Sequence, residues 1–313
     1  MVKITNLEVL AQQSDYAKYV VDILDFYVPL VLQLPKLRDN PQLMKETVKA
    51  RSASGVTDVA TQADEYVQEK IKEEVLQRHL DWQFWGEEGS DNVSEYDSTK
   101  TILVVNDPIE GTNNFKHHKD NQWGSVIGLV DVNTRKPIAG IIAHPIERTF
   151  YVGVKDVGAF ELKYDEKGVL VKFNRMKAEP EFDEFTYNNS PHFEDNLVAQ
   201  VEKFYGLGEV QPLSRDADEL ERSRREVHIN RNGDDYIFVD PESGALEAVR
   251  YRGTICFKTS NEMAAVFPII EELGGKVTDG NGNSWSLGIN TLIAGRNAKD
   301  YELLKEVYNQ TRK

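Results

Sequence analysis

The chain of 313 residues contains a single cysteine, Cys256, and lacks a long apolar run. One cysteine excludes an intrachain disulfide and a zinc site built from several cysteines, and this usage fits a reducing cytosol. The most apolar early stretch, residues 19–34, is interrupted by Asp22, Asp25 and Pro29 and is too short to span a bilayer. The first residues also lack a basic region followed by an apolar one. We therefore expect a cytoplasmic protein with no targeting signal and no membrane partner.

The chain also has fewer basic than acidic residues. The chain has 37 basic and 52 acidic residues, so its formal net charge is −15. A surface that binds nucleic acid would be basic, so this balance argues against a nucleic-acid polymer as a partner. Hydrophobic residues make up 40% of the chain and aromatic residues 10%, which is enough for a sizeable core. The length suggests about two domains, or one large α/β unit.

Strand-like and helix-like segments alternate along the chain without a strict βαβ rhythm. Apolar periodicity predicts helices over residues 5–34, 61–79, 261–273 and 300–310. Apolar, β-branched runs predict strands over residues 82–86, 101–106, 125–131, 137–143, 149–154 and 244–252, from residue 158, and around Val277, Leu287 and residues 292–294. This order favours a layered α/β or α+β fold. A shift in composition near residue 185 predicts a boundary between residues 1–185 and 186–313.

Two carboxylates follow the apolar run that ends at residue 106. Asp107 comes directly after it, and Glu110 follows three residues later. Pro108 is expected to end strand pairing, and Gly111 permits unusual backbone torsions before Thr112 begins a turn into a helix. Carboxylates in such a turn can converge on Mg²⁺, which prefers oxygen ligands, and the backbone N–H groups after Gly111 would suit an anion. An ordinary strand-to-turn transition with acidic residues is the alternative.

Two further acidic motifs lie upstream. Glu87 follows a predicted strand in the sequence Gly-Glu-Glu-Gly-Ser, where it either binds a metal or lies in an exposed acidic turn. Asp64 comes three residues after Thr61, which is the spacing of a capping box. Asp64 therefore either caps the helix that starts there or orients a threonine hydroxyl elsewhere in the chain.

A fourth motif lies near the C-terminus. Glu262 follows Thr259 at the same capping-box spacing and either caps the helix or contributes a carboxylate to a site. The small residues Ala264 and Ala265 come next, and they would let this helix pack close to a neighbouring element.

The four motifs, in this order, closely resemble those of the inositol monophosphatase superfamily of magnesium-dependent, lithium-sensitive phosphatases. The family pattern Asp-Pro-Ile-Asp-Gly-Thr-x-x-Phe reads here DPIEGTNNF, and the upstream patterns Gly-Glu-Glu and Asp-x-x-Thr-x-x-Asp are both present. The downstream pattern Trp-Asp-x-Ala-Ala…Gly-Gly appears as Asn-Glu-Met-Ala-Ala…Gly-Gly. The similarity covers residues 50–165 and 240–295, whereas residues 165–240 match poorly. It implies a five-layer αβαβα sandwich of the inositol monophosphatase and fructose-1,6-bisphosphatase type.

The resemblance also implies an activity, the metal-dependent hydrolysis of a small phosphorylated metabolite. The metal would be Mg²⁺, about two or three ions per site, with Mn²⁺ as an alternative. The metal ligands it implies are the side chains of Glu87, Asp107, Glu110 and Glu262 and the carbonyl of Ile109. Thr112, hydrogen-bonded to Asp64, would help to activate the attacking water, and backbone N–H groups near Gly111 and Thr112 would hold the phosphate. Residues 1–185 would carry the metal site and residues 186–313 would close it. The same resemblance leads us to expect a homodimer.

Several residues depart from the family pattern. Glu110 and Glu262 stand where aspartate is usual, and Asn261 stands where tryptophan is usual. Glutamate adds one methylene, and Mg²⁺ tolerates little deviation from octahedral geometry, so a catalytically weakened binding or regulatory member of the fold is one alternative. Arg250 and Arg252 would favour an anionic group on the substrate over a polyol, unless they are simply exposed on a strand. A 3'(2'),5'-bisphosphate nucleotidase or a sugar bisphosphatase is therefore a second alternative.

Overall fold

The computed structural model of the chain describes residues 6–51, 57–88, 96–118, 123–177, 186–187, 253–256, 263–289, 291–295 and 297–311. Three residues of the predicted site, Arg250, Arg252 and Glu262, lie outside these ranges, as does the predicted strand over residues 244–252. Among the described residues, no helix combines the length and the apolar character that crossing a bilayer would require.

The N-terminal region forms three helices where the periodicity predicted one. They are α1 (Asn6–Ala11), α2 (Asp15–Val31) and α3 (Leu34–Leu37). The break between α1 and α2 has a local cause, because the Ser14 side chain accepts a hydrogen bond of 3.1 Å from the N–H of Ala17 and so caps α2. The prediction of helix in this region is confirmed, but the prediction of one continuous helix is wrong.

The next two elements are a short hairpin and a long helix. Strands β1 (Glu46–Arg51) and β2 (Thr57–Thr61) pair antiparallel, and α4 (Gln62–Arg78) follows directly. Thr61 and His79 cap the two ends of α4, so the helix predicted over residues 61–79 is confirmed.

The described residues form a central sheet of seven strands in the order β3-β4-β5-β6-β7-β8-β9. They are β3 (Trp82–Gly86), β4 (Ile102–Glu110), β5 (Gly124–Asp131), β6 (Lys136–His144), β7 (Thr149–Val154), β8 (Gly158–Tyr164) and β9 (Leu170–Arg175). β3 and β4 run parallel, and the other neighbours run antiparallel. Every residue of β4 is buried because helices cover both faces of the sheet, which explains its continuous apolar run. The predicted central strands are confirmed.

The C-terminal region adds a helix, a second sheet and a last helix. Helix α10 (Val266–Glu272) lies within the helix predicted over residues 261–273, whose first two residues lie outside the described ranges. The second sheet has the order β10-β11-β13-β12, and α11 (Ala298–Thr311) follows it. Its strands are β10 (Thr186–Tyr187), β11 (Gly253–Cys256), β12 (Lys276–Thr278) and β13 (Leu292–Gly295). The predicted strand at Leu287 is wrong, because this residue lies in a turn and packs its apolar side chain beside the core that contains Trp285.

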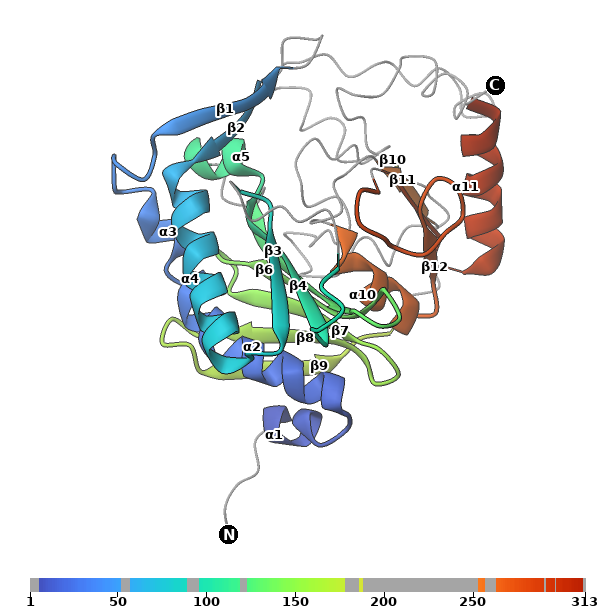
Figure 1. Cartoon of the computed structure of the whole chain (residues 1–313), viewed down its shortest axis with the longest axis horizontal. Coiled ribbons are helices and arrows are strands. Elements are labelled where there is room, and N and C mark those ends of the chain that lie inside the picture. Colours follow the sequence, from blue (N-terminus) through green and yellow to red (C-terminus); the bar gives the residue numbers. More distant parts are fainter. Residues whose placement is uncertain are drawn as a thin grey trace.

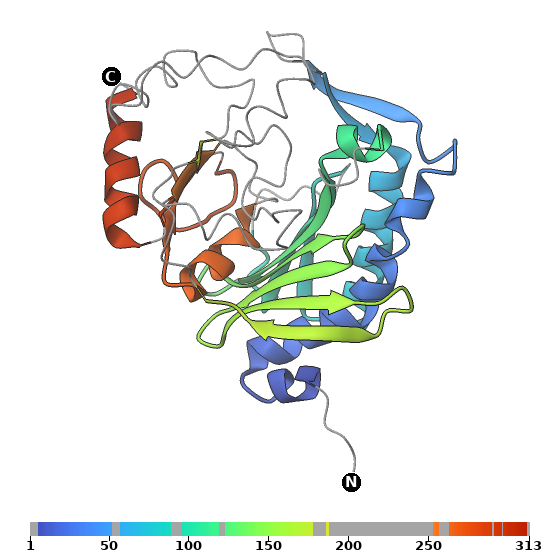
Figure 2. The ribbon, with the colours of Figure 1, turned by 180° about the vertical axis from the view of Figure 1, so that it is seen from behind.

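These elements stack in layers, which Figure 1 shows from one side and Figure 2 from behind. Helices α2 and α4 cover one face of the central sheet, and α10 covers the other. The second sheet comes next, and α11 lies on its outer side. The order helix, sheet, helix, sheet, helix confirms the predicted five-layer αβαβα arrangement. The boundary expected near residue 185 falls between β9 and β10 and stays a prediction.

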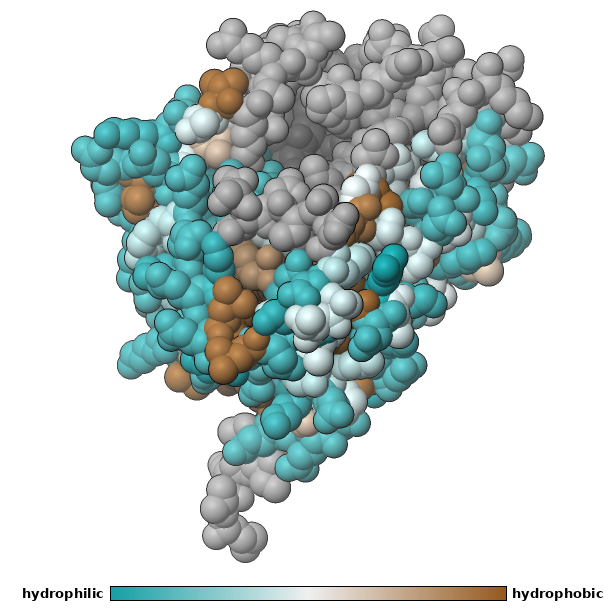
Figure 3. Space-filling view, viewed as in Figure 1, coloured by the Kyte–Doolittle hydropathy of each residue, from teal (hydrophilic) through white to brown (hydrophobic). Residues whose placement is uncertain are grey.

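The described surface is mainly hydrophilic on the face in Figure 3, where small apolar patches lie among polar side chains. Among the described residues, Val169 and Val171 are exposed together at the start of β9, and the other exposed large apolar side chains come from separate parts of the chain: Val9, Val48, Tyr66 and Leu80. Single exposed apolar residues of this kind are normal for a globular protein.

Three glycines lie side by side across the central sheet and form what we call the glycine groove, made of Gly128 in β5, Gly140 in β6 and Gly153 in β7. A Cβ atom on Gly128 would lie 2.5 Å from Ala264 Cβ, and one on Gly140 would lie 2.0 Å from the carbonyl oxygen of Ala265. A Cβ atom on Gly153 would lie 2.5 Å from the backbone nitrogen of Ile269. Residues 264–269 therefore occupy space that only glycine leaves open. The prediction that Ala264 and Ala265 allow close packing is confirmed.

Candidate active site

The end of β4 contains a β-bulge. The pairing with β5 passes from Asp107 opposite Val126 to Glu110 opposite Gly124, so two residues of β4 stand opposite one residue of β5. Pro108 is one of the two residues inside the bulge, where its missing N–H costs no ladder hydrogen bond. The prediction that Pro108 ends the pairing is therefore wrong, because the strand continues through the bulge to Glu110.

The bulge brings two carboxylates to the same face of the sheet. In a regular strand, residues three positions apart point to opposite faces, and one extra residue reverses this relation. Residues directly opposite each other in an antiparallel pair share a face, and Val126 belongs to the core beside α10. Asp107 and Glu110 therefore face the α10 side, where they are only 2% and 4% exposed. Ile109, in contrast, packs into the core on the side of α2 and α4.

A turn after β4 presents the hydroxyl of Thr112. Gly111 adopts the left-handed conformation, with φ 81° and ψ 38°, and α5 (Thr112–Lys116) begins immediately after it. The Thr112 hydroxyl lies 2.9 Å from Asp64 Oδ1 and 3.0 Å from the carbonyl oxygen of Ile109. A hydroxyl has one proton, so Thr112 can donate to only one of these acceptors at a time.

Asp64 itself is only 1% exposed and uses its two oxygens differently. Oδ1 accepts from Thr112, whereas Oδ2 accepts from the backbone N–H of Thr61 at 2.8 Å and from the Thr61 hydroxyl at 2.6 Å. The sequence left two interpretations of Asp64 open, a helix cap or a partner for a distant threonine. The structure shows both contacts at once.

Glu87 lies at the same edge of the sheet as Asp107. β3 and β4 are parallel, with Gly86 opposite Asn106, so the ends of both strands meet at one edge. The N–H of Glu87 donates to the carbonyl oxygen of Asn106 at 3.1 Å, directly before Asp107. Glu87 is half-buried, and the backbone of the next residue is held by Gln68 from α4. The sequence analysis missed Gln68, although a polar residue beside Val67 on the buried face of α4 was a signal.

A second residue that the sequence analysis missed lies on the opposite side of the bulge. The hydroxyl of Tyr27, on α2, donates to Ser125 Oγ at 2.7 Å, and Ser125 is the residue of β5 that stands opposite the bulge. Burial raises the pKa of Tyr27 well above its ordinary value, while the hydrogen bond to Ser125 acts in the opposite direction. Tyr27 therefore stays neutral and supports the bulge through a buried hydrogen bond.

The donor atoms at this edge suit a hard cation, because all are oxygens: carboxylates and the carbonyl of Ile109. Within the described part of the chain, no group of three His, Cys, Asp or Glu side chains converges closely enough to hold a metal ion. Glu262, the remaining predicted ligand, lies outside the described residues and directly precedes Met263, which is buried on the α10 side of the sheet. The metal-binding roles of Glu87, Asp107, Glu110 and Ile109 stay predictions.

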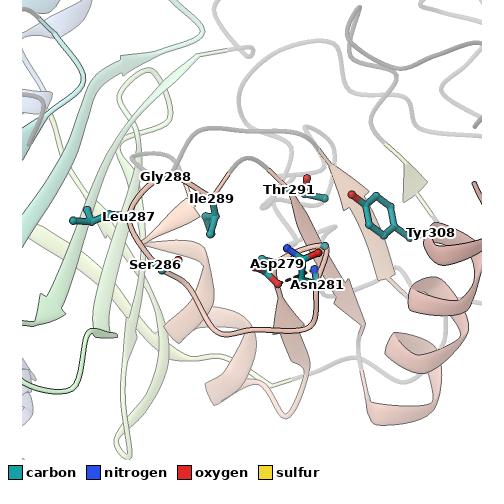
Figure 4. Close-up of a pocket in the computed structure, with 9 residues that line it drawn as sticks. Asp279, Asn281, Ser286, Leu287, Gly288, Ile289, Thr291 and Tyr308 are labelled. Carbon is teal, nitrogen blue, oxygen red and sulfur yellow. Dashed lines mark hydrogen bonds between the residues drawn. The ribbon is translucent and has the colours of Figure 1, made fainter. Parts of the chain in front are cut away.

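A separate pocket of about 220 Å³ lies in the C-terminal region, between the loop after β12 and α11. Figure 4 shows Asp279 and Tyr308 among the residues that line it, and none of these residues belongs to the predicted site. The Asp279 carboxylate accepts hydrogen bonds from the N–H groups of Asn281 at 2.8 Å and Asn283 at 2.7 Å. This aspartate therefore shapes its own loop.

Comparisons with known proteins relate this chain to one family. The family model for the inositol monophosphatase family matches residues 34–211. Inositol monophosphatase 3 of Solanum lycopersicum is 27% identical over 122 residues, which are 38% of this chain and 44% of that protein. Inositol monophosphatase 2 of Saccharomyces cerevisiae is 29% identical over 132 residues, or 41% of this chain and 43% of that protein. The chain thus aligns with less than half the length of these curated relatives.

Solved structures share the fold over a longer range. The extragenic suppressor protein suhB from Bartonella henselae superposes with a TM-score of 0.63 at 19% identity, covering 93% of this chain and 99% of that chain. Inositol monophosphatase II from Staphylococcus aureus gives a TM-score of 0.62 at 15% identity, covering 95% and 94%. At these identities the likeness shows the fold alone. Since the family model matches more than half of the chain, the protein belongs to the inositol monophosphatase family.

Proposed function

We propose that the protein is a phosphatase that hydrolyses a small phosphate monoester with Mg²⁺ as its cofactor. The observation that carries the proposal is the hydrogen bond of 2.9 Å between Thr112 Oγ1 and Asp64 Oδ1, next to two buried carboxylates on one face of a bulge. Membership in the inositol monophosphatase family supports the class of reaction. A homodimer is part of the same proposal and rests on the family resemblance alone.

The residues proposed to hold the metal come from two neighbouring strand ends and from the region before α10. They are Glu87, Asp107, Glu110, Glu262 and, through its carbonyl, Ile109. The chemistry that Mg²⁺ supplies in such sites is the neutralisation of charge on the phosphoryl oxygens and a lowered pKa of water. Mn²⁺ has the same preference for oxygen ligands and is the alternative ion.

Thr112 and Asp64 are proposed to handle the proton of the attacking water. When the Thr112 hydroxyl donates a hydrogen bond to Asp64, its lone pairs can accept a hydrogen bond from the attacking water, and as a proton of the water moves to Oγ1 the Thr112 proton moves to Asp64 Oδ1. The carbonyl oxygen of Ile109, 3.0 Å from the same hydroxyl, then does not receive that proton. The backbone N–H groups of Gly111 and Thr112 would hold the phosphate in line with the water.

A phosphate-release assay tests the proposal. The panel contains inositol 1-phosphate, 3'-phosphoadenosine 5'-phosphate and fructose 1,6-bisphosphate, each with Mg²⁺ or Mn²⁺. Asp107→Asn should lower turnover by more than about 100-fold, since loss of a metal ligand should exceed the effect of losing an outer-shell partner. Its circular dichroism spectrum should match that of the wild type. If no substrate gives more phosphate with wild-type protein than with Asp107→Asn, the protein is not a phosphatase for this class of substrate.

The same panel separates the candidate substrates. Arg250 and Arg252 favour a second anionic group, so preference for a bisphosphate and loss of that preference in Arg250→Ala would support a bisphosphate nucleotidase or a sugar bisphosphatase. Calorimetric binding of Mg²⁺ and phosphate without turnover would instead support a weakened binding or regulatory member. The longer side chains of Glu110 and Glu262 motivate that second candidate.

A further inference from the structure

The loop after β3 is held by a side chain of α4. Gln68 Nε2 donates to the carbonyl oxygen of Glu88 at 2.9 Å, and the N–H of Glu88 donates to Gln68 Oε1 at 2.8 Å. A primary amide has a donor and an acceptor in one plane, so it can pair with both backbone groups of a residue as a neighbouring strand would. Gln68 and Glu88 are both buried, which makes each of these hydrogen bonds costly to lose. We call this pair of hydrogen bonds the Gln68 clamp.

The Gln68 clamp occupies the space above Gly86. A Cβ atom on Gly86 would lie 2.1 Å from Gln68 Cδ, 2.2 Å from its Oε1 and 2.5 Å from its Nε2. The clamp therefore requires glycine at the last position of β3. The three close atoms belong to the end of a flexible side chain, so a small side chain at position 86 would displace the amide without moving backbone.

Gln68 lies one helical turn after Asp64, so both side chains project from the same face of α4. Asp64 contacts Thr112 in the turn after β4, and Gln68 contacts Glu88 in the loop after β3. One face of one helix thus holds the loop that contains Glu87 and the turn that directly follows the proposed ligands at the end of β4.

Glu87 lies between two fixed points. Its own N–H is bonded to the carbonyl oxygen of Asn106, and both backbone groups of the next residue are bonded to Gln68. Fixing the backbone on both sides limits where the Glu87 carboxylate can reach. Mg²⁺ demands near-ideal octahedral geometry, so a ligand held in this way binds with less loss of conformational entropy than a ligand on a free loop.

We propose that Gln68 is a positioning residue that fixes Glu87 for metal binding, an inference that rests on the proposed function. The clamp lowers the apparent dissociation constant for Mg²⁺ without touching the metal or the substrate. A role in stability alone would predict that the loss of the clamp destabilises the fold and leaves the affinity for Mg²⁺ unchanged.

The test measures Mg²⁺ binding by calorimetry on the full chain without substrate. Gln68→Met keeps the length of the side chain and removes both hydrogen bonds. It should weaken Mg²⁺ binding by about 10- to 100-fold, the effect typical of residues that orient metal ligands. In the phosphate-release assay the Mg²⁺ concentration for half-maximal activity should rise by the same factor, while kcat at saturating Mg²⁺ should change by less than about 3-fold.

Two matched controls lie on the same helix. Gln77→Met makes the same substitution at an exposed position of α4 and should leave Mg²⁺ binding unchanged. Val75→Ala removes buried apolar atoms two turns after Gln68 and should lower the unfolding temperature without changing the affinity for Mg²⁺.

Gly86→Ala provides a second way to break the clamp if Gln68→Met does not fold. The added methyl group should displace the Gln68 amide and weaken Mg²⁺ binding in the same direction. If the wild type binds Mg²⁺ and both variants bind it with unchanged affinity, the positioning role is wrong while the proposed function stands. If the wild type binds no Mg²⁺ and releases no phosphate, both proposals fail.

Discussion

Gly140→Ala is the substitution for which the structure gives the sharpest expectation. The new Cβ atom would lie 2.0 Å from the carbonyl oxygen of Ala265, 2.5 Å from its Cα and 2.6 Å from its carbonyl carbon. Non-bonded carbon contacts are favourable only near about 3.5–4.0 Å. All three close atoms belong to the backbone, so no side-chain rotation relieves the clash. Residues 264–265 must move away from the sheet by about 1–1.5 Å.

This movement should lower the free energy of unfolding by an amount that overpacking data bracket. Overpacking of a well-packed core typically costs about 1–3 kcal/mol, and we expect the upper end because both sides of the contact are buried backbone. For domains of about 150–250 residues each kcal/mol lowers the unfolding temperature by about 2–4 °C, so a cost of about 3 kcal/mol should lower it by about 6–12 °C. Thermal unfolding monitored by circular dichroism would measure it. Because residues 264–265 follow the proposed ligand Glu262 so closely, binding of Mg²⁺ should weaken as well.

A neighbouring glycine offers a matched comparison. In Gly128→Ala the nearest atom to the new Cβ is the Cβ of Ala264, at 2.5 Å, so Gly128→Ala combined with Ala264→Gly should recover part of the lost stability. Gly140→Ala combined with Ala265→Gly should recover none, because the clashing backbone atoms remain. Close backbone packing at Gly140 is refuted if Gly140→Ala unfolds within about 1 °C of the wild type, or if Ala265→Gly restores as much stability to Gly140→Ala as Ala264→Gly restores to Gly128→Ala.

Two further predictions concern buried polar groups. Tyr27→Phe removes the donor to Ser125 Oγ opposite the bulge, so it should lower the free energy of unfolding by about 1 kcal/mol in urea titrations, and an unchanged midpoint would show that the hydrogen bond does not matter. Burial lowers the pKa of His144 to about 4, so as the pH falls the unfolded chain takes up this proton first, near pH 6.5. The free energy of unfolding should therefore fall between about pH 6.5 and pH 4, by up to about 3 kcal/mol from this residue, and His144→Phe should remove that part of the decrease.

Much of the fold follows from local sequence signals. The buried strands β3 to β7 coincide with apolar, β-branched runs, and α4 begins and ends where its capping residues predict. Two predictions were wrong because tertiary contacts, rather than local sequence, decide the structure at those positions. The bulge around Pro108 depends on the register with β5, which lies far away in the chain, and Leu287 is apolar because it packs beside a core while it lies in a turn.

The site was predicted less completely than the fold. The contact between Thr112 and Asp64 was expected from the family resemblance and is present, while its role in catalysis stays a prediction. The position of Gln68 beside Val67 signals that this side chain is buried, but its partner, like that of Tyr27, lies in a segment that is distant in the sequence. A glutamine on a helix or a tyrosine on another gives no local sign of which backbone or hydroxyl it will meet.

The glycine groove has a consequence for how the sequence of this protein can evolve. Where residues 264–269 meet the sheet, the contact is made largely by main-chain atoms, which every amino acid shares. Side chains around this contact can therefore be substituted during evolution without changing the distance between the sheet and residues 264–269. The glycine groove thus keeps the distance between the central sheet and residues 264–269 constant. Side chains that the sheet and this segment contribute to one site can therefore keep their separation while the surrounding sequence diverges.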